Sequence, residues 1–156
     1  MAPTCFADFN KFPANLEGTV KYVATYYGAQ PAFTDNVVYV VTKNIHPDNT
    51  CEYYWAIDPM GLNGFFSKEL IITVDDDKKY TCKQYINPGE DLKDDSKLAT
   101  GIVYSVPAEV ITAISNYKKA VSVAYTFEGK DILDKNIAIK EDIKRIQAAQ
   151  YLDLVK

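Results

Sequence analysis

The chain holds a single histidine, so any nucleophilic site that uses an imidazole base would have to be built on it. His46 is followed by Pro47 in the run His-Pro-Asp-Asn, which is typical of a solvated turn. No Gly-x-Ser-x-Gly turn accompanies it. Glycine-rich phosphate loops and the zinc-binding motif His-Glu-x-x-His do not occur either. The motifs therefore favour neither a histidine-assisted hydrolase nor a cofactor enzyme, and no cofactor or metal is expected.

Carboxylates are the other groups with catalytic or metal-binding potential, since the chain has 21 Asp and Glu residues. Two of them held close together would allow glycosidase-type hydrolysis, although no spacing in the sequence identifies such a pair. Residues 75–77 are three consecutive aspartates that could bind calcium with help from Asp91, Asp94 or Asp95. Their spacing is not that of an EF-hand, and consecutive acids in a hairpin are typical of a solubilising turn.

The cysteines bear on the compartment and on the core. Cys51 and Cys82 each lie in an alternating run and share the phase of its apolar residues, so both sulfurs are expected to point inward. A disulfide between them is possible if their strands are neighbours. The alternative is two reduced core cysteines. No Cys-x-x-Cys pair is present, which argues against a zinc site.

Paired aromatic residues indicate a possible contact surface. In Tyr53-Tyr54 and Phe65-Phe66 an extended chain would place one ring on each face of a strand. Residues 58–64 contain one proline and two glycines, as expected for an exposed loop. The alternative is that the rings form a second layer of core. The candidate contact residues are Tyr53, Tyr54, Trp55, Asp58, Met60, Leu62, Phe65 and Phe66.

The elements that would position these residues follow from hydrophobic periodicity. Two-residue alternation predicts strands over residues 19–27, 37–45, 51–57, 69–74, 79–86, 102–106 and 121–127. Spacing of three and four residues predicts helices near 107–118 and 139–152. We therefore expect an α+β fold, with a largely antiparallel sheet of about six or seven strands covered on one face by the two helices. A small β-barrel with a C-terminal helix is the alternative.

Length and charge limit the partners. The 156 residues predict a single domain, 1–156, whose residues 1–15 form an irregular leader. A net charge of −4 and a single arginine, Arg145, argue against nucleic acid, and no apolar run is long enough for a membrane span. Residues 1–8 look like the tail of an export signal, which favours a periplasmic or secreted protein over a cytoplasmic one.

These patterns together predict a non-catalytic domain that binds another protein, such as an exported binding, inhibitor or immunity-type factor. A small hydrolase with a carboxylate site and a calcium-dependent interaction module are the alternatives. The oligomeric state stays open.

Overall fold

The computed structural model describes residues 24–29, 36–58, 64–85, 102–135 and 137–154. Their strands form two four-stranded antiparallel sheets. The first sheet has the order β1-β2-β3-β6, with β1 Ala24–Ala29, β2 Asn36–Ile45, β3 Cys51–Asp58 and β6 Ile102–Val106. The second has the order β5-β4-β7-β8, with β5 Lys78–Lys83, β4 Glu69–Val74, β7 Val121–Phe127 and β8 Lys130–Asp134.

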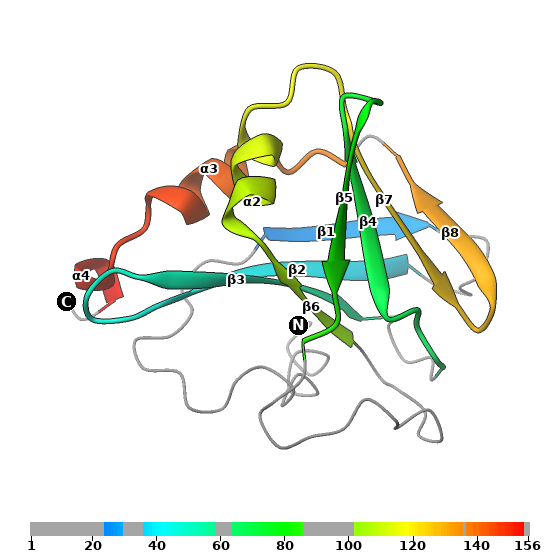
Figure 1. Ribbon diagram of the computed structural model, residues 1–156, viewed down its shortest axis with the longest axis horizontal. Coiled ribbons are helices and arrows are strands. Elements are labelled where there is room, and N and C mark those ends of the chain that lie inside the picture. The colour runs from blue at the N-terminus through cyan, green and yellow to red at the C-terminus, as the bar shows by residue number, and fades with distance from the viewer. Residues whose placement is uncertain (1–23, 30–35, 59–63, 86–101, 136, 155–156) are drawn as a thin grey trace.

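The two sheets are joined at one corner, and at the other corner no pairing joins them within the described residues. A bridge pairs Gln84, just after β5, with Tyr104 of β6, and the Tyr85 N–H donates to the Val103 carbonyl at 2.8 Å. In Figure 1 strands β1 to β3 run across the view while β4, β5, β7 and β8 stand upright on them. Strands β1 and β8 are the outer strands of this arrangement, so the described residues form no closed barrel.

The helices close one side of the space between the sheets. Helix α2 (Ala108–Ser115) packs on α3 (Lys140–Ala148), and both contact the first sheet. Figure 1 shows them side by side above β3, away from β8. A last turn, α4, spans Tyr151–Leu154. None of the helices in these ranges is long and apolar enough to cross a bilayer.

Both sheets and the two longer helices share one hydrophobic core. In β7 the odd-numbered residues are buried and the even-numbered ones are only partly covered, as the period of a strand requires. The helices contribute isoleucines at helical spacing to the same core. The largest fully buried side chains include Trp55, Tyr39, Tyr104, Ile57, Ile72, Ile111, Ile114 and Ile143.

The α+β class, the antiparallel pairing and both main helices are confirmed. The strands are divided between two sheets instead of one, and the described residues include an eighth strand, β8, which the hydrophobic pattern did not predict. The predicted C-terminal helix is interrupted at Ala149, whose extended backbone (φ −65°, ψ 142°) separates α3 from α4. Strand β8 was missed because Lys-Asp-Ile-Leu-Asp is short and mostly charged, which is typical of an edge strand.

Candidate interaction surface on the second sheet

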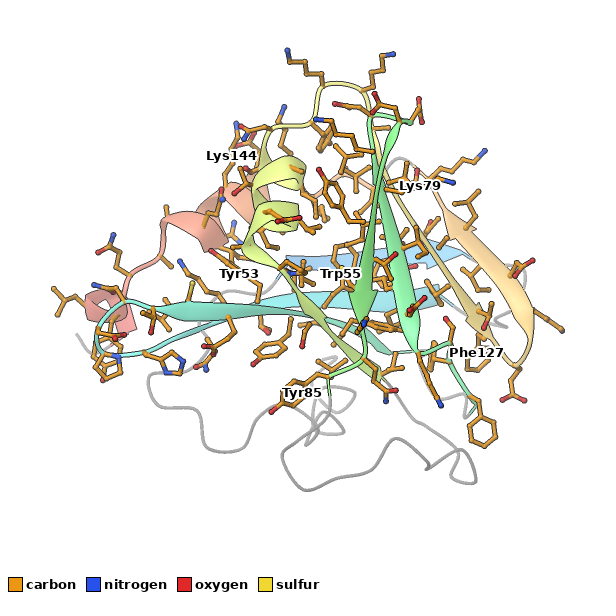
Figure 2. The ribbon with its side chains drawn as sticks, in the orientation of Figure 1. Tyr53, Trp55, Lys79, Tyr85, Phe127 and Lys144 are labelled. Carbon is orange, nitrogen blue, oxygen red and sulfur yellow. The ribbon has the colours of Figure 1, made fainter. Side chains whose placement is uncertain are left out.

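Three of the predicted contact residues lie in the core. Strand β3 is flanked by β2 and β6, and Tyr53, Tyr54 and Trp55 are 7%, 6% and 0% exposed. Figure 2 shows Tyr53 and Trp55 on the side of β3 that faces the second sheet, with Tyr85 on the opposite side. Tyr54 packs edge-to-face on Tyr85, with ring centroids 5.2 Å apart, and burial raises its pKa to about 12. The rings of Tyr53 and Tyr54 are therefore both core side chains, as the alternative of a second core layer predicted for them.

The remaining predicted contact residues are placed less uniformly. Phe65 is exposed, whereas Phe66 packs against Phe127 with ring centroids 4.8 Å apart. Asp58 is the last residue of β3. Its side chain lies outside the described residues, as do Met60 and Leu62. Phe65 is thus the one described member of the predicted set with an exposed ring.

Cys51 and Cys82 are free thiols, which corrects the disulfide alternative. Their strands are not neighbours, because β3 belongs to the first sheet and β5 to the second. Cys82 is fully enclosed, and burial raises the pKa of its thiol to about 12. Cys82 is therefore a core residue, as the other interpretation of the sequence had it, and Cys51 is partly buried against the core.

The polar groups with chemical potential are engaged with their own surroundings. His46 Nε2 lies 2.8 Å from the Glu52 carboxylate in an exposed turn. The Asp75 carboxylate accepts hydrogen bonds from the backbone N–H groups of Lys119, Lys118 and Ala120, at 2.6 to 3.2 Å. These bonds, that of Lys119 above all, lower the pKa of Asp75. Asp75 therefore ties the β4–β5 turn to the loop before β7.

The possible calcium and metal sites find no support within the described ranges. No three His, Cys, Asp or Glu side chains gather there to hold a metal ion. Asp91, Asp94 and Asp95 lie outside those ranges.

Two sets of buried polar contacts, one around Tyr39 and one around Lys43, were not identified from the sequence. The Tyr39 hydroxyl donates to the Asp134 carboxylate at 2.8 Å and accepts from Tyr125 at 2.9 Å, which links the two sheets inside the core. The Lys43 ammonium donates to the carbonyls of Gln147 and Ala149 at 2.9 and 2.8 Å, at the C-terminal end of α3. A cation at that end is stabilised by the helix dipole. Asp134 is two residues after the apolar Ile132, so in a strand both side chains point inward. This indication could be used only if β8 had first been predicted as a strand.

The most exposed apolar side chain on either sheet, among the described residues, is on β8. Leu133 is 53% exposed and faces away from the core. The register places Ile71 opposite Ala124, and Ala124 opposite Leu133, so a row of apolar side chains crosses β4 and β7 and ends at β8. In Figure 1 neither α2 nor α3 covers this outer face of the second sheet.

Phe65 lies next to the same hairpin. The Glu128 N–H donates to the Phe65 carbonyl at 2.8 Å, and the Phe65 N–H donates to the Glu128 carboxylate. Glu128 and Gly129 form the two-residue turn between β7 and β8, with φ of 53° and 77°. Positive φ at both positions is the signature of a type I′ turn, which keeps the hairpin tightly paired.

In the part of the chain that the structure describes, one side of the β8 backbone has no partner strand. Strand β8 pairs with β7 and with no other strand in the described residues. Such an edge, with an exposed leucine beside it, can bind another extended strand.

Comparisons of the chain with protein-family models, with curated proteins and with solved structures found no match.

Proposed function

We propose that this protein is a non-catalytic protein-binding domain that uses the β8 edge as its contact surface. The β8 edge comprises Asp131, Leu133 and Lys135, together with the two residues in the same row as Leu133, Ala124 of β7 and Ile71 of β4. The observation that carries the proposal is Leu133, which is half-exposed on a strand that, among the described residues, pairs on one side only. Burying a leucine of this kind against a partner contributes about 1 kcal/mol or more to binding.

Backbone direction supports the proposal. The Thr126 N–H of β7 donates to the Ser67 hydroxyl, and the Thr126 carbonyl accepts from the Ser67 N–H. Ser67 lies on the β4 side of β7. Thr126 lies opposite Asp131 in the register, so Thr126 and Asp131 form a non-hydrogen-bonded pair. Hydrogen-bonded and non-hydrogen-bonded pairs alternate along the hairpin, so Leu133 and Ala124 form the next non-hydrogen-bonded pair. The backbone groups of Asp131 and Leu133 therefore point away from β7, toward the open side.

The contacts of the ionisable side chains described above are consistent with binding rather than catalysis. Lys43 holds the end of α3, and the Tyr39–Asp134 pair links the sheets. Asp75 holds a loop, and the one histidine forms an exposed pair with Glu52. Lys43, Asp134 and Asp75 are thus engaged in contacts that hold the fold together.

The proposal moves the contact surface predicted from the sequence. Tyr53, Tyr54 and Trp55 are enclosed and give a partner no access. Phe65 stays accessible beside the β7–β8 turn. The partner of the domain is expected to be a protein that presents an extended strand.

Site-specific cross-linking tests this function. A photoreactive amino acid replaces Leu133 in one preparation and Leu152 in another, and each protein is irradiated in extract of the native host. Leu152 is the matched control because it is 69% exposed but lies on α4, away from β8. Adducts to protein at position 133, well above those at 152 and identified by mass spectrometry, support the proposal. Equal or absent adducts at the two positions contradict it.

A further inference from the structure

We infer that the strand bound by the β8 edge is β8 of a second copy, paired antiparallel about a twofold axis through Leu133. This inference rests on the proposed function and names its partner. In this dimer the second sheet of one copy continues into the second sheet of the other.

Strand direction and backbone geometry allow this pairing. The outward backbone groups of β8 belong to odd-numbered residues, Asp131 and Leu133, and the extended chain would carry the pattern to Lys135, which follows β8 directly. A register centred on Leu133 sets odd-numbered residues of one copy against odd-numbered residues of the other. Their N–H and carbonyl groups then face each other, and the exposed side chains of both strands lie on the same outer face.

Charge selects this register among the alternatives. Centring on Leu133 sets Leu133 against itself and Asp131 against Lys135 of the second copy, twice by symmetry. Both side chains are exposed, and two-residue alternation puts them in phase with Leu133 if the chain stays extended to Lys135. Opposite charges that face each other across paired strands stabilise the pairing, and like charges destabilise it.

The neighbouring registers are poorer. Moving the centre by one residue, to Ile132, places Leu133 opposite Asp131 and removes the leucine contact. Centring between Ile132 and Leu133 sets Lys130 against Lys135, and it also opposes residues whose backbone groups point in different directions. Charged residues on an edge strand usually deter pairing. Here their order sets opposite charges against each other in the register centred on Leu133, which is also the register that brings the two leucines together.

The dimer extends the apolar row of the outer face. The row Ile71, Ala124 and Leu133 of one copy would meet the same row of the other copy at the two leucines. The two rows would form one continuous line across the joined second sheets of both copies. The contact is a single strand pair with one leucine contact, so it belongs to the small interfaces that dissociate readily. Self-association is therefore expected to depend strongly on protein concentration.

Charge reversal gives the sharpest test, with sedimentation velocity as the measurement. The wild-type protein is expected to shift from monomer to dimer between micromolar and millimolar concentration. Asp131→Lys alone, or Lys135→Asp alone, sets like charges against each other twice and is expected to weaken the dimer about tenfold or more. An equimolar mixture of the two variants restores both opposite-charge pairs and is expected to dimerise like the wild type. The doubly reversed chain is expected to do the same.

Several results would overturn the inference. Wild-type protein that stays monomeric up to millimolar concentration, or single variants that dimerise as tightly as the wild type, would each refute self-pairing. A mixture that stays monomeric would refute the register. Circular dichroism of each variant confirms the fold, since both side chains are exposed. Cross-links from position 133 to a different protein, together with a monomeric wild type, would refute self-pairing and leave the proposed function standing.

Discussion

The Tyr39 hydroxyl donates a 2.8 Å hydrogen bond to the Asp134 carboxylate, joining β2 of the first sheet to β8 of the second. Both residues are almost fully buried, at 1% and 6% exposure. The bond holds β8 from inside the core, while within the described residues the side of β8 away from β7 has no partner strand. An edge held in this way is preorganised for a partner strand, because little conformational freedom is left to lose on binding.

Removing the Tyr39 hydroxyl is expected to destabilise the protein. Tyr39→Phe takes away the bonds to Asp134 and Tyr125, and the buried carboxylate loses a donor. The expected loss in unfolding free energy is about 1–3 kcal/mol, measured by urea denaturation. Tyr125→Phe leaves the Tyr39–Asp134 bond in place and should cost less. A Tyr39→Phe protein as stable as the wild type would show that the bond does not stabilise the fold.

Alkaline pH is expected to unfold the protein. Burial raises the pKa of Tyr39, Tyr104 and Tyr125 above the value of about 10 that an unfolded tyrosine has. The stabilising contribution is complete below that value, and it is lost as pH rises toward the folded pKa values, because only the unfolded state then releases protons. Phenolate absorbance of these rings should appear together with the loss of circular dichroism. Ionisation of all tyrosines before any unfolding would contradict the expectation.

Acid should loosen the Asp75 contacts. Backbone hydrogen bonds lower the folded pKa of Asp75, so its contribution is present above the unfolded value of about 3.9 and is lost as pH falls through the folded pKa. Asp75→Ala removes the acceptor and is expected to lower the thermal midpoint at neutral pH. Asp75→Asn retains one acceptor oxygen and suits the positive φ of 56°, so it should be milder and should lose the acid dependence. Identical midpoints for the three proteins across this pH range would refute the role of the carboxylate.

Replacing Lys43 is expected to release the end of α3. Lys43→Met leaves the Gln147 and Ala149 carbonyls without the ammonium donor. Hydrogen bonds to a charged group contribute about 1.5–3 kcal/mol, so a loss of that order is expected, with faster hydrogen exchange over the last turn of α3. Lys144→Met, on the exposed side of the same helix, is the matched control and should change stability by less than about 0.5 kcal/mol. Equal effects of the two substitutions would contradict the role of Lys43.

Thiol labelling checks the cysteines directly. The sequence has three cysteines, and Cys51 and Cys82 are free. Three reactive thiols are therefore expected in denaturant without reductant. In the native protein Cys82 should react slowly, since burial keeps its thiol protonated. A single reactive thiol in denaturant would mean that a disulfide has formed after all.

Local patterns in the sequence were enough to predict most elements. Two-residue alternation located β7 at residues 121–127 in full, and the helix at 108–115 follows from the apolar spacing after Pro107. These assignments succeed because periodicity depends only on near neighbours along the chain. The inward phase of Cys51 and Cys82 was predictable for the same reason.

Tertiary structure alone decided which strands are neighbours. Tyr53 and Tyr54 are both enclosed because β3 lies between two strands and is covered on both faces, a property that no local pattern carries. The Tyr39–Asp134 bond spans 95 residues, so it depends on how the sheets are packed. Leu133 became a candidate contact residue because β8 ends a sheet, and the end of a sheet is set by what pairs with it rather than by its own residues.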